Sequence, residues 1–503
     1  MLAFSRPGHS GPPAPMKLRP RLVNALKSKR AAIEEICKVS GVAGVSIAVI
    51  DQGKTILQDN FGYCDLENRE PVTSDTIFPI ASMTKSFTGV CINRLRHEGK
   101  LSLDDLIVKH IPEAKSQDHV VATITTIADL LRHRTGLQGA NNIWLGAQGE
   151  LLFNRDNILE PLNMTRTIMK NDEVMLEHLS LAYGTLDNRV PYQVPVPGSS
   201  ASRVMGAAGG LLSTANDLAK YYKALMGSWQ TQAKLGEDDA GTRHKPSMFG
   251  QVPWLFTPLQ IMEMPALREK SYAARWARSQ LPTTVGDIGI NAGLLEQMPL
   301  LAAGINSRLA LWHQGSLVGA TSFVMMLPET ESAVVVLTNT MAINDAADWI
   351  GQLLVETLLD APVRNDYVAM ASLSADSALK RYEELAHKVE EGRESKGIGR
   401  DLNDYIGSYV GFGGIFRIEV VDSDKGLAIL FQGRASQMYQ LGHHHEDTFT
   451  WFMTWNEQIK NARFIVTDPA FYFISFQTEQ GKVAALNWVH DASIPEGEFF
   501  MKV

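Results

Sequence analysis

Ser82 and Lys85 are the residues of this sequence whose types and spacing most directly indicate a chemical reaction. They belong to the segment Ser82-Met-Thr-Lys85, which follows a strand-like stretch (Thr76 to Ile80) and begins an amphipathic helix. Residues three apart in a first helical turn share a face, so the Lys85 amine can lie beside the Ser82 hydroxyl. A lysine desolvated in a cleft holds its proton less tightly and can take the proton of the serine. The pair therefore predicts a nucleophilic serine activated by a lysine base.

The same two residues also have an ordinary structural explanation. Ser82 can cap the N-terminus of the helix, and Lys85 can lie in solvent on its first turn. A serine and a lysine at this spacing arise by chance about once or twice in a chain of this length. The motif therefore needs support from the rest of the sequence.

The composition excludes several classes of protein. The 503 residues are 45% hydrophobic and 20% charged, which is typical of a globular chain rather than a disordered or fibrous one. The net charge of -8 does not favour nucleic acid or anionic lipid as a partner. No apolar run approaches the roughly 18 residues of a membrane span. Three cysteines and an N-terminus without an apolar signal core lead us to expect a cytoplasmic protein.

No cofactor and no metal are predicted. The glycine-rich segment from Gly206 to Asp217 does not follow a strand with the spacing of a phosphate-binding loop. The consecutive residues His443, His444 and His445 point in different directions on any regular element, so a surface turn is expected there rather than a metal site.

Two hairpins mark the ends of a predicted sheet. Gly44 to Ile50 and Thr55 to Phe61 flank the turn Asp51-Gln-Gly53. Much later, Thr321 to Leu327 and Ala333 to Leu337 flank a polar turn. Helical spacing is found between the hairpins, for example in Ser82 to His97, Thr126 to Arg132 and Ala215 to Met226. The pattern predicts an α+β fold whose antiparallel sheet is built from both chain ends, with a helical subdomain inserted.

One long stretch has two interpretations. Trp229 to Leu300 contains Trp254, Phe256, Tyr272 and Trp276 among methionines and prolines. It is either an ordinary helical subdomain packed by these rings, or an apolar lid over a bulky acyl or polyketide substrate.

The residue pattern of the C-terminal part differs from that of the preceding sequence. Residues 363–404 are polar and helix-prone, which predicts a charged helical linker. Short alternating segments beyond it predict an all-β barrel; they are Phe416 to Val421, Leu427 to Phe431, Thr448 to Thr454, Phe464 to Thr467, Phe471 to Gln477 and Val483 to Trp488. The expected organisation is a disordered tail (1–18), an α+β domain (19–362), the linker (363–404) and the barrel (405–503).

Six motifs in order support a catalytic role for Ser82. They are Ser82-Met-Thr-Lys85-Ser-Phe-Thr, Gly99-Lys-Leu-Ser-Leu-Asp-Asp105, Asp129-Leu-Leu-Arg-His133-Arg-Thr-Gly-Leu137, Pro161-Leu-Asn-Met-Thr-Arg-Thr167, the glycine-rich segment ending at Asp217, and His313-Gln-Gly315 followed by Gly319 and Leu337-Thr-Asn339. Together they resemble the serine β-lactamase and penicillin-binding protein superfamily, on its class C β-lactamase, esterase and acyltransferase branch. The α+β domain is most similar to fungal β-lactamase-like proteins. The barrel resembles the lipocalin-like domain of some peptidases in this superfamily, which can hold a small ligand.

The resemblance implies a role for each matching residue. Ser82 is expected to be the nucleophile that forms an acyl-enzyme, and Lys85 to help deprotonate it. His313 is expected to orient substrate or tune the proton network, and Gly315 to let the substrate backbone approach closely. The backbone N–H groups of Ser82 and Ser316 are expected to form the oxyanion hole.

The sequence departs from the family at one motif. The family carries Tyr-x-Asn or Tyr-x-Ser before the segment that matches Pro161, but only 24 positions separate Leu137 from Pro161, and none is a tyrosine. Tyr183, beyond that segment, is the weak alternative for the missing residue. Either the deletion is genuine, with Lys85 as sole base, or the chain derives from an incomplete gene model or splice form joined near Glu150.

These observations predict a serine hydrolase or acyltransferase working through a Ser82 acyl-enzyme. Its partner would be a small-molecule ester, amide or thioester, for example a polyketide or peptide intermediate of fungal secondary metabolism. Two alternatives stay open: a catalytically impaired binding protein that lacks the tyrosine, and a hydrolase similar to D-amino-acid peptidases.

Overall fold

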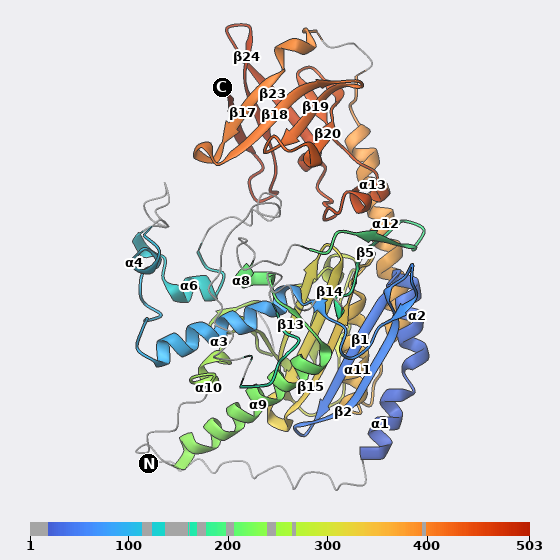
Figure 1. Cartoon of the computed structure of the whole chain (residues 1–503), viewed down its shortest axis with the longest axis vertical. Coiled ribbons are helices and arrows are strands. Elements are labelled where there is room, and N and C mark those ends of the chain that lie inside the picture. The colour runs from blue at the N-terminus through green and yellow to red at the C-terminus, as the bar shows by residue number, and fades with distance from the viewer. Residues whose placement is uncertain are drawn as a thin grey trace.

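A computed structural model describes residues 19–112, 123–135, 159, 161–168, 178–197, 206–238, 248–263, 268–394 and 399–503. It contains an α+β domain and a C-terminal barrel, joined by one long helix (Figure 1). The predicted tail and the interval between Leu137 and Pro161, apart from Leu159, lie outside the described residues.

The α+β domain is built on an antiparallel sheet that nine strands of the described residues form in the order β3-β2-β1-β15-β14-β13-β10-β9-β8. Their bounds are β1 (Gly44–Asp51), β2 (Lys54–Asp65), β3 (Glu70–Pro71), β8 (Gln260–Ile261), β9 (Lys270–Tyr272), β10 (Ala277–Leu281), β13 (Arg308–Leu317), β14 (Ala320–Leu327) and β15 (Ser332–Thr338). β1 pairs with β15, so that Val45 lies opposite Thr338 and Ile50 opposite Ala333. The prediction of a sheet made from both chain ends is confirmed.

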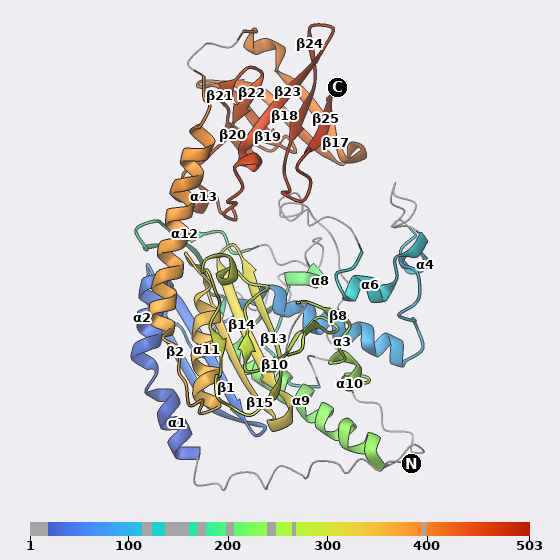
Figure 2. The ribbon, with the colours of Figure 1, turned by 180° about the vertical axis from the view of Figure 1, so that it is seen from behind.

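Helices cover both faces of this sheet, because successive strand residues point to opposite sides. Val45 and Ile47 of β1 pack into the core beneath one set of helices, and Ala48 and Ile50 into the core beneath the other. The first set is α1 (Arg19–Lys27), α2 (Arg30–Ser40), α11 (Ala346–Leu358) and the start of α12 (Tyr367–Glu390), seen from behind in Figure 2. The second is α3 (Thr84–His97), α9 (Ala215–Asp238) and α10 (Val252–Leu255).

Smaller elements complete the domain. They are α4 (Ile107–His110), α6 (Ile127–Leu131), α8 (Gly206–Gly209), the pair β4 (Phe78–Pro79) and β7 (Leu212–Ser213), the three-stranded sheet of β5 (Ala182–Thr185), β6 (Pro191–Val194) and β16 (Thr340–Met341), the pair β11 (Thr283–Thr284) and β12 (Leu300–Leu301), and the 3-10 helices η2 (Ala81–Met83), η5 (Asn291–Gly293) and η6 (Pro328–Thr330).

The stretch from Trp229 to Leu300 is not the helical subdomain that its aromatic content suggests. Within its described residues, only the rest of α9 and the short α10 are α-helical, and β8, β9 and β10 extend the central sheet. Tyr272 and Trp276 are buried in the two cores of that sheet. These strands are too short to show an alternating pattern, so only their pairing partners reveal them.

The C-terminal residues form a nearly closed antiparallel barrel (Figure 1) with the described strand order β20-β19-β18-β17-β25-β24-β23-β22-β21. Its elements are β17 (Gly407–Gly411), β18 (Phe416–Ser423), β19 (Gly426–Phe431), β20 (Met438–Gln440), β21 (Gly442–His445), β22 (Thr448–Thr450), α13 (Trp455–Lys460), β23 (Phe473–Glu479), β24 (Lys482–Trp488), β25 (Glu498–Lys502) and the 3-10 helices η7 (Leu402–Asp404), η8 (Phe412–Gly414), η9 (Ala435–Gln437) and η10 (Pro469–Tyr472). Two local predictions were wrong: Phe464 to Thr467 is not a strand, and the three consecutive histidines lie in β21, with His444 buried, rather than in a surface turn.

Aromatic rings fill the barrel interior. Trp488 stacks on Phe431 with ring centroids 4.9 Å apart, and Trp451 lies 5.0 Å from Phe471. All four side chains are buried in one hydrophobic cluster. The centre of this barrel is therefore a packed core.

The barrel is docked on the α+β domain. α12 covers much of the predicted linker, and it packs on α2 and α11 at its start and on the barrel cluster further along. In α13, Trp455 Nε1 donates to the Thr185 carbonyl at 2.8 Å, and Ile459 packs on Gly184. Figures 1 and 2 show the barrel beyond one end of the central sheet, with α12 running alongside both parts.

Candidate active site

The backbone immediately before Ser82 is held in an unusual conformation. Ala81 has a φ of 48°, in the left-handed region that a non-glycine residue rarely occupies. Ser322 Oγ donates to the carbonyl of Ile80 at 2.9 Å. A Cβ on Gly315 would lie 2.8 Å from that same carbonyl oxygen, so only glycine fits where β13 passes beneath this turn. The sheet therefore fixes the position from which Ser82 projects.

Lys85 lies beside Ser82 at the start of α3. Its Nζ is 2.5 Å from Ser82 Oγ and also donates to the carbonyl of Ala208 at 3.3 Å. Burial, and after it the positive charge of Arg275, lowers the pKa of Lys85 from 10.5 to about 8. A lysine in this state is neutral in a sizeable fraction of molecules near neutral pH, which a base requires.

His313, on β13, is buried and hydrogen-bonded at both ring nitrogens. Nδ1 lies 2.5 Å from the carbonyl oxygen of Gln314, which can only accept, so this nitrogen carries the proton. Nε2 is therefore the acceptor, and the Tyr272 hydroxyl, 3.0 Å away, donates to it. Burial, and after it the charge of Lys85, lowers the pKa of His313 to about 3, so the ring is neutral.

Two adjoining cavities meet at the Ser82–Lys85 pair, and both are also lined by Ile288, Gly289, Ile290 and Ser316. Most residues that line the inner cavity, of about 540 Å³, are of polar type; besides those just named they are Arg132, His133, Gln260, Met262, Tyr272, His313, Gln314, Gly315 and Asp345. The structure thus brings together Ser82, Lys85, His313, Gly315 and Ser316, which the resemblance assigns to one site.

The interdomain cavity, of about 820 Å³, lies between the α+β domain and the barrel. The α+β domain and α12 contribute Gly293, Leu294, Leu317, Met341, Ala342, Ile343, Ala378 and Arg381. The barrel contributes Trp455, Ile459, Phe464, Ile465, Val466, Thr467, Asp468, Phe471, Val489, His490, Asp491 and Ala492. Most of these residues are apolar in type, and Ser82 lines both cavities.

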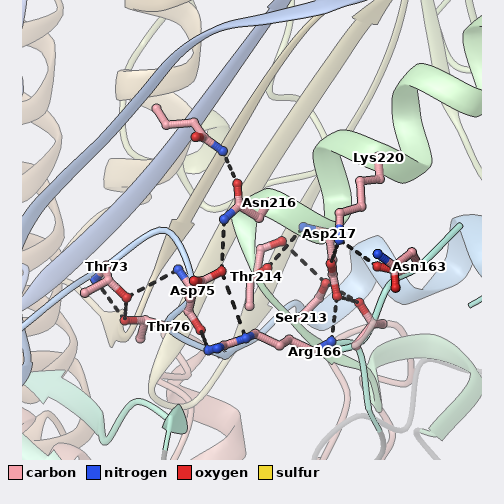
Figure 3. Close-up of polar contacts among 12 residues, drawn as sticks. Thr73, Asp75, Thr76, Asn163, Arg166, Ser213, Thr214, Asn216, Asp217 and Lys220 are labelled. Carbon is pink, nitrogen blue, oxygen red and sulfur yellow. Dashed lines mark hydrogen bonds and ion pairs between the residues drawn. The ribbon is translucent and has the colours of Figure 1, made fainter.

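A polar network holds the segment that contains Arg166 against the start of α9 (Figure 3). The buried carboxylate of Asp217 accepts from the Arg166 backbone N–H at 2.8 Å, from Thr167 Oγ1 at 3.1 Å and from Lys220 Nζ at 2.8 Å. Thr167 Oγ1 also lies 2.8 Å from the hydroxyl of Ser213. Ser213 belongs to β7, which pairs with β4 just ahead of Ser82. The network thus supports the strand that leads into the nucleophile.

Tyr183 is not at this site. Its hydroxyl accepts from the Leu66 backbone N–H at 2.9 Å, and it lines neither of the two cavities. The tyrosine that the structure places near His313 is Tyr272, which sequence reasoning noted only as part of an aromatic stretch. Because Tyr272 reaches the site through the pairing of β9, β10 and β13, no local sequence motif predicts its position there.

We expect Tyr272→Phe to slow the labelling of Ser82 by a fluorophosphonate probe by about tenfold, because it leaves the buried Nε2 of His313 without a donor. Tyr183→Phe is the matched control and should leave the labelling rate within about twofold, because the Tyr183 hydroxyl accepts from the Leu66 backbone N–H and not from a group of the site. Equal rates for the two variants would remove Tyr272 from the site.

A serine adjoining a lysine of lowered pKa, on an α+β scaffold, defines a site of the serine-hydrolase type. The chain belongs to the Beta-lactamase family, whose sequence model matches residues 30–152 and 151–356. The two matches meet at the predicted join near Glu150. Residues 398–501 match a domain of unknown function, DUF3471.

Curated relatives match over parts of their length. "Protein flp" of Staphylococcus aureus strain MRSA252 is 23% identical over 345 residues, or 61% of each chain. The "Serine beta-lactamase-like protein LACTB, mitochondrial" of Mus musculus is 32% identical over 133 residues, 26% of this chain and 24% of that one. "Protein flp" of strain MW2 is 31% identical over 140 residues, only 27% of its length.

Solved structures with a similar fold include the octameric penicillin-binding protein homologue from Pyrococcus abyssi (TM-score 0.49, 20% identity, 93% of this chain and 96% of that one). A class C beta-lactamase has a TM-score of 0.48 and 16% identity, over 70% of this chain and 99% of that one. Across the described ranges, no helix is long and apolar enough to cross a membrane.

Proposed function

We propose that the protein transfers an acyl group through an ester formed on Ser82, taking an ester, amide or thioester of a small metabolite as its substrate. The observation that carries this proposal is the 2.5 Å approach of Lys85 Nζ to Ser82 Oγ at the junction of two cavities. The low pKa of Lys85 supports it, because a neutral amine can accept the serine proton.

The proposed reaction has two balanced halves. Lys85 takes the proton of Ser82 as the serine oxygen attacks the acyl carbonyl carbon. The bond from that carbon to the leaving oxygen, nitrogen or sulfur breaks, and the leaving group departs with the proton from Lys85. Water or another nucleophile then attacks the carbonyl carbon of this ester and gives its proton to Lys85. The bond from that carbon to the Ser82 oxygen breaks, and the serine oxygen takes the proton back from Lys85 as the acyl product leaves. Backbone N–H groups of Ser82 and Ser316 are proposed to stabilise the oxyanion.

The two cavities suggest how a substrate lies. An apolar acyl group would fill the interdomain cavity, and the polar leaving group would face the inner cavity, with the carbonyl at Ser82. A role in fungal secondary metabolism, a cytoplasmic location and a lipocalin-like ancestry of the barrel stay predictions from the sequence.

A fluorophosphonate probe tests the proposal directly. We expect the intact protein to gain one adduct, which peptide mass spectrometry locates on Ser82. Ser86→Ala is the control and should be labelled as the wild type is, because the Ser86 hydroxyl donates to the carbonyl of Met83, the residue just before α3. A folded protein that stays unlabelled would instead support the alternative of a binding protein derived from a hydrolase.

A further inference from the structure

The barrel contributes a buried histidine to the interdomain cavity. His490 follows β24, is only 3% exposed, and lines the cavity that also contains Ser82. Its ring packs against Trp488 and Phe412, with centroids 5.6 Å and 5.3 Å away. The side chain is thus held at one end of the cavity by aromatic neighbours.

Neither ring nitrogen of His490 has a hydrogen-bond partner within the described part of the chain. An unpaired polar atom in a buried position costs free energy that folding does not recover. Most other polar groups of the barrel have hydrogen-bond partners. The unpaired state of His490 therefore favours a ligand in the cavity as its hydrogen-bond partner. Burial holds the pKa of His490 below its usual 6.5, so the ring is neutral and offers one donor and one acceptor.

The carboxylates nearest to His490 are already engaged. Asp491 accepts from the backbone N–H of Ser493 at 2.9 Å and from its hydroxyl at 2.8 Å. Asp468 accepts from the Ala470 backbone N–H at 2.9 Å, as the cap of η10. In both side chains the bonded atom is Oδ1. A carboxylate only accepts hydrogen bonds and repels an anion, so these two acids disfavour an anionic ligand.

The two cations that line the cavity come from α3 and α12 rather than from the barrel. Lys85 is paired with Ser82, and Arg381, an exposed residue of α12, donates to the carbonyl of Gly293. The barrel side of the cavity therefore combines apolar side chains with the neutral donor and acceptor of His490 and with two carboxylates, which only accept. A hydroxyl group matches that combination, since it both donates and accepts and carries no charge.

We propose that His490 binds a hydroxyl group on an otherwise apolar acyl chain whose carbonyl is attacked by Ser82. This assignment rests on the proposed function and narrows its substrate class to hydroxylated acyl esters or thioesters. The barrel then acts as the part of the enzyme that distinguishes one acyl chain from another, while the α+β domain performs the transfer.

The test compares kcat/KM for p-nitrophenyl octanoate with that for a set of hydroxyoctanoate esters that carry the hydroxyl at successive carbons. The wild type should prefer at least one hydroxy isomer by about tenfold, the value of one hydrogen bond. His490→Phe keeps the size of the ring and should lose this preference. His387→Phe, at an exposed position of α12, is the control and should keep the preference.

The outcomes separate this proposal from the proposed function. An unchanged preference in His490→Phe, or no preferred isomer in the wild type, overturns the role of His490. Turnover of all esters that survives Ser82→Ala overturns the proposed function instead. Should thermal unfolding show that His490→Phe does not fold, the same ratio of kcat/KM values is measured in His490→Leu, which has a smaller side chain.

Discussion

Replacing Lys85 with methionine is expected to lower the rate at which Ser82 is acylated by about a thousandfold. Methionine keeps most of the length of the lysine stem but offers no base. The only nitrogen that the described residues place within 3 Å of Ser82 Oγ is then lost. The measurement is the second-order rate constant for fluorophosphonate labelling.

The pH dependence of the wild type follows from the same residue. Because the neutral amine is the active form and the pKa of Lys85 is about 8, the rate should rise with pH and level off above pH 8. At pH 6 it should be about a hundredfold below the plateau, since each unit below the pKa costs a factor of ten. Arg275→Gln removes the charge that helps to lower this pKa, so the rising limb should move to higher pH.

Two results would contradict this role for Lys85. One is labelling at the wild-type rate in Lys85→Met, and the other is a rising limb that persists in that variant. Thermal unfolding of Lys85→Met provides the control for folding, and we expect a stable protein, because removing a half-buried amine also removes its desolvation cost.

The low pKa of Lys85 offers a physical explanation of how Ser82 is activated without the tyrosine motif. A lysine whose pKa is about 8 can accept the serine proton near neutral pH without a second base. The two matches to the family meet at residues 151–152, where we expect the motif to have been lost or omitted. Sequencing the transcript across Glu150 distinguishes these histories, and the rate of Lys85→Met shows whether the chain as it stands depends on the lysine.

Short-range patterns predicted the parts of the site that are local in the sequence. Ser82 and Lys85 lie one helical turn apart, so their spacing alone places them together. The two hairpins that make the centre of the sheet have turns of a few residues and long alternating strands, which the sequence displays directly.

The rest of the site depends on contacts between residues far apart in the sequence, which local patterns do not predict. Tyr272 lies in a strand of three residues, and it meets His313 only because β9 and β13 both pair with β10. His490 comes from a different domain, and its approach to Ser82 depends on how α13 docks on β5 and β6. The barrel was recognisable from its short alternating strands, but its packed aromatic interior depends on which faces point inward.

Replacing Asp217 with alanine is expected to lower the free energy of unfolding by about 3 kcal/mol, because several buried groups then lose a hydrogen-bond partner at once. The carboxylate is 2% exposed and serves the Arg166 N–H, the Thr167 hydroxyl and the Lys220 amine. Alanine leaves the Arg166 N–H without this acceptor and leaves the Thr167 hydroxyl with Ser213 as its remaining partner. Equilibrium unfolding in urea, followed by tryptophan fluorescence, measures the loss.

Asp75→Ala is the matched control within the same network (Figure 3). Its side chain is 54% exposed, where it accepts from Asn216 Nδ2 at 3.0 Å and lies 4.0 Å from Arg166 Nε. Exposed pairs contribute little, so we expect a loss below about 1 kcal/mol. Equal losses in the two variants would show that burial does not set the strength of this network. A large loss confined to Asp217→Ala, accompanied by slower labelling of Ser82, would show that the network supports β7 and, through β4, the nucleophile.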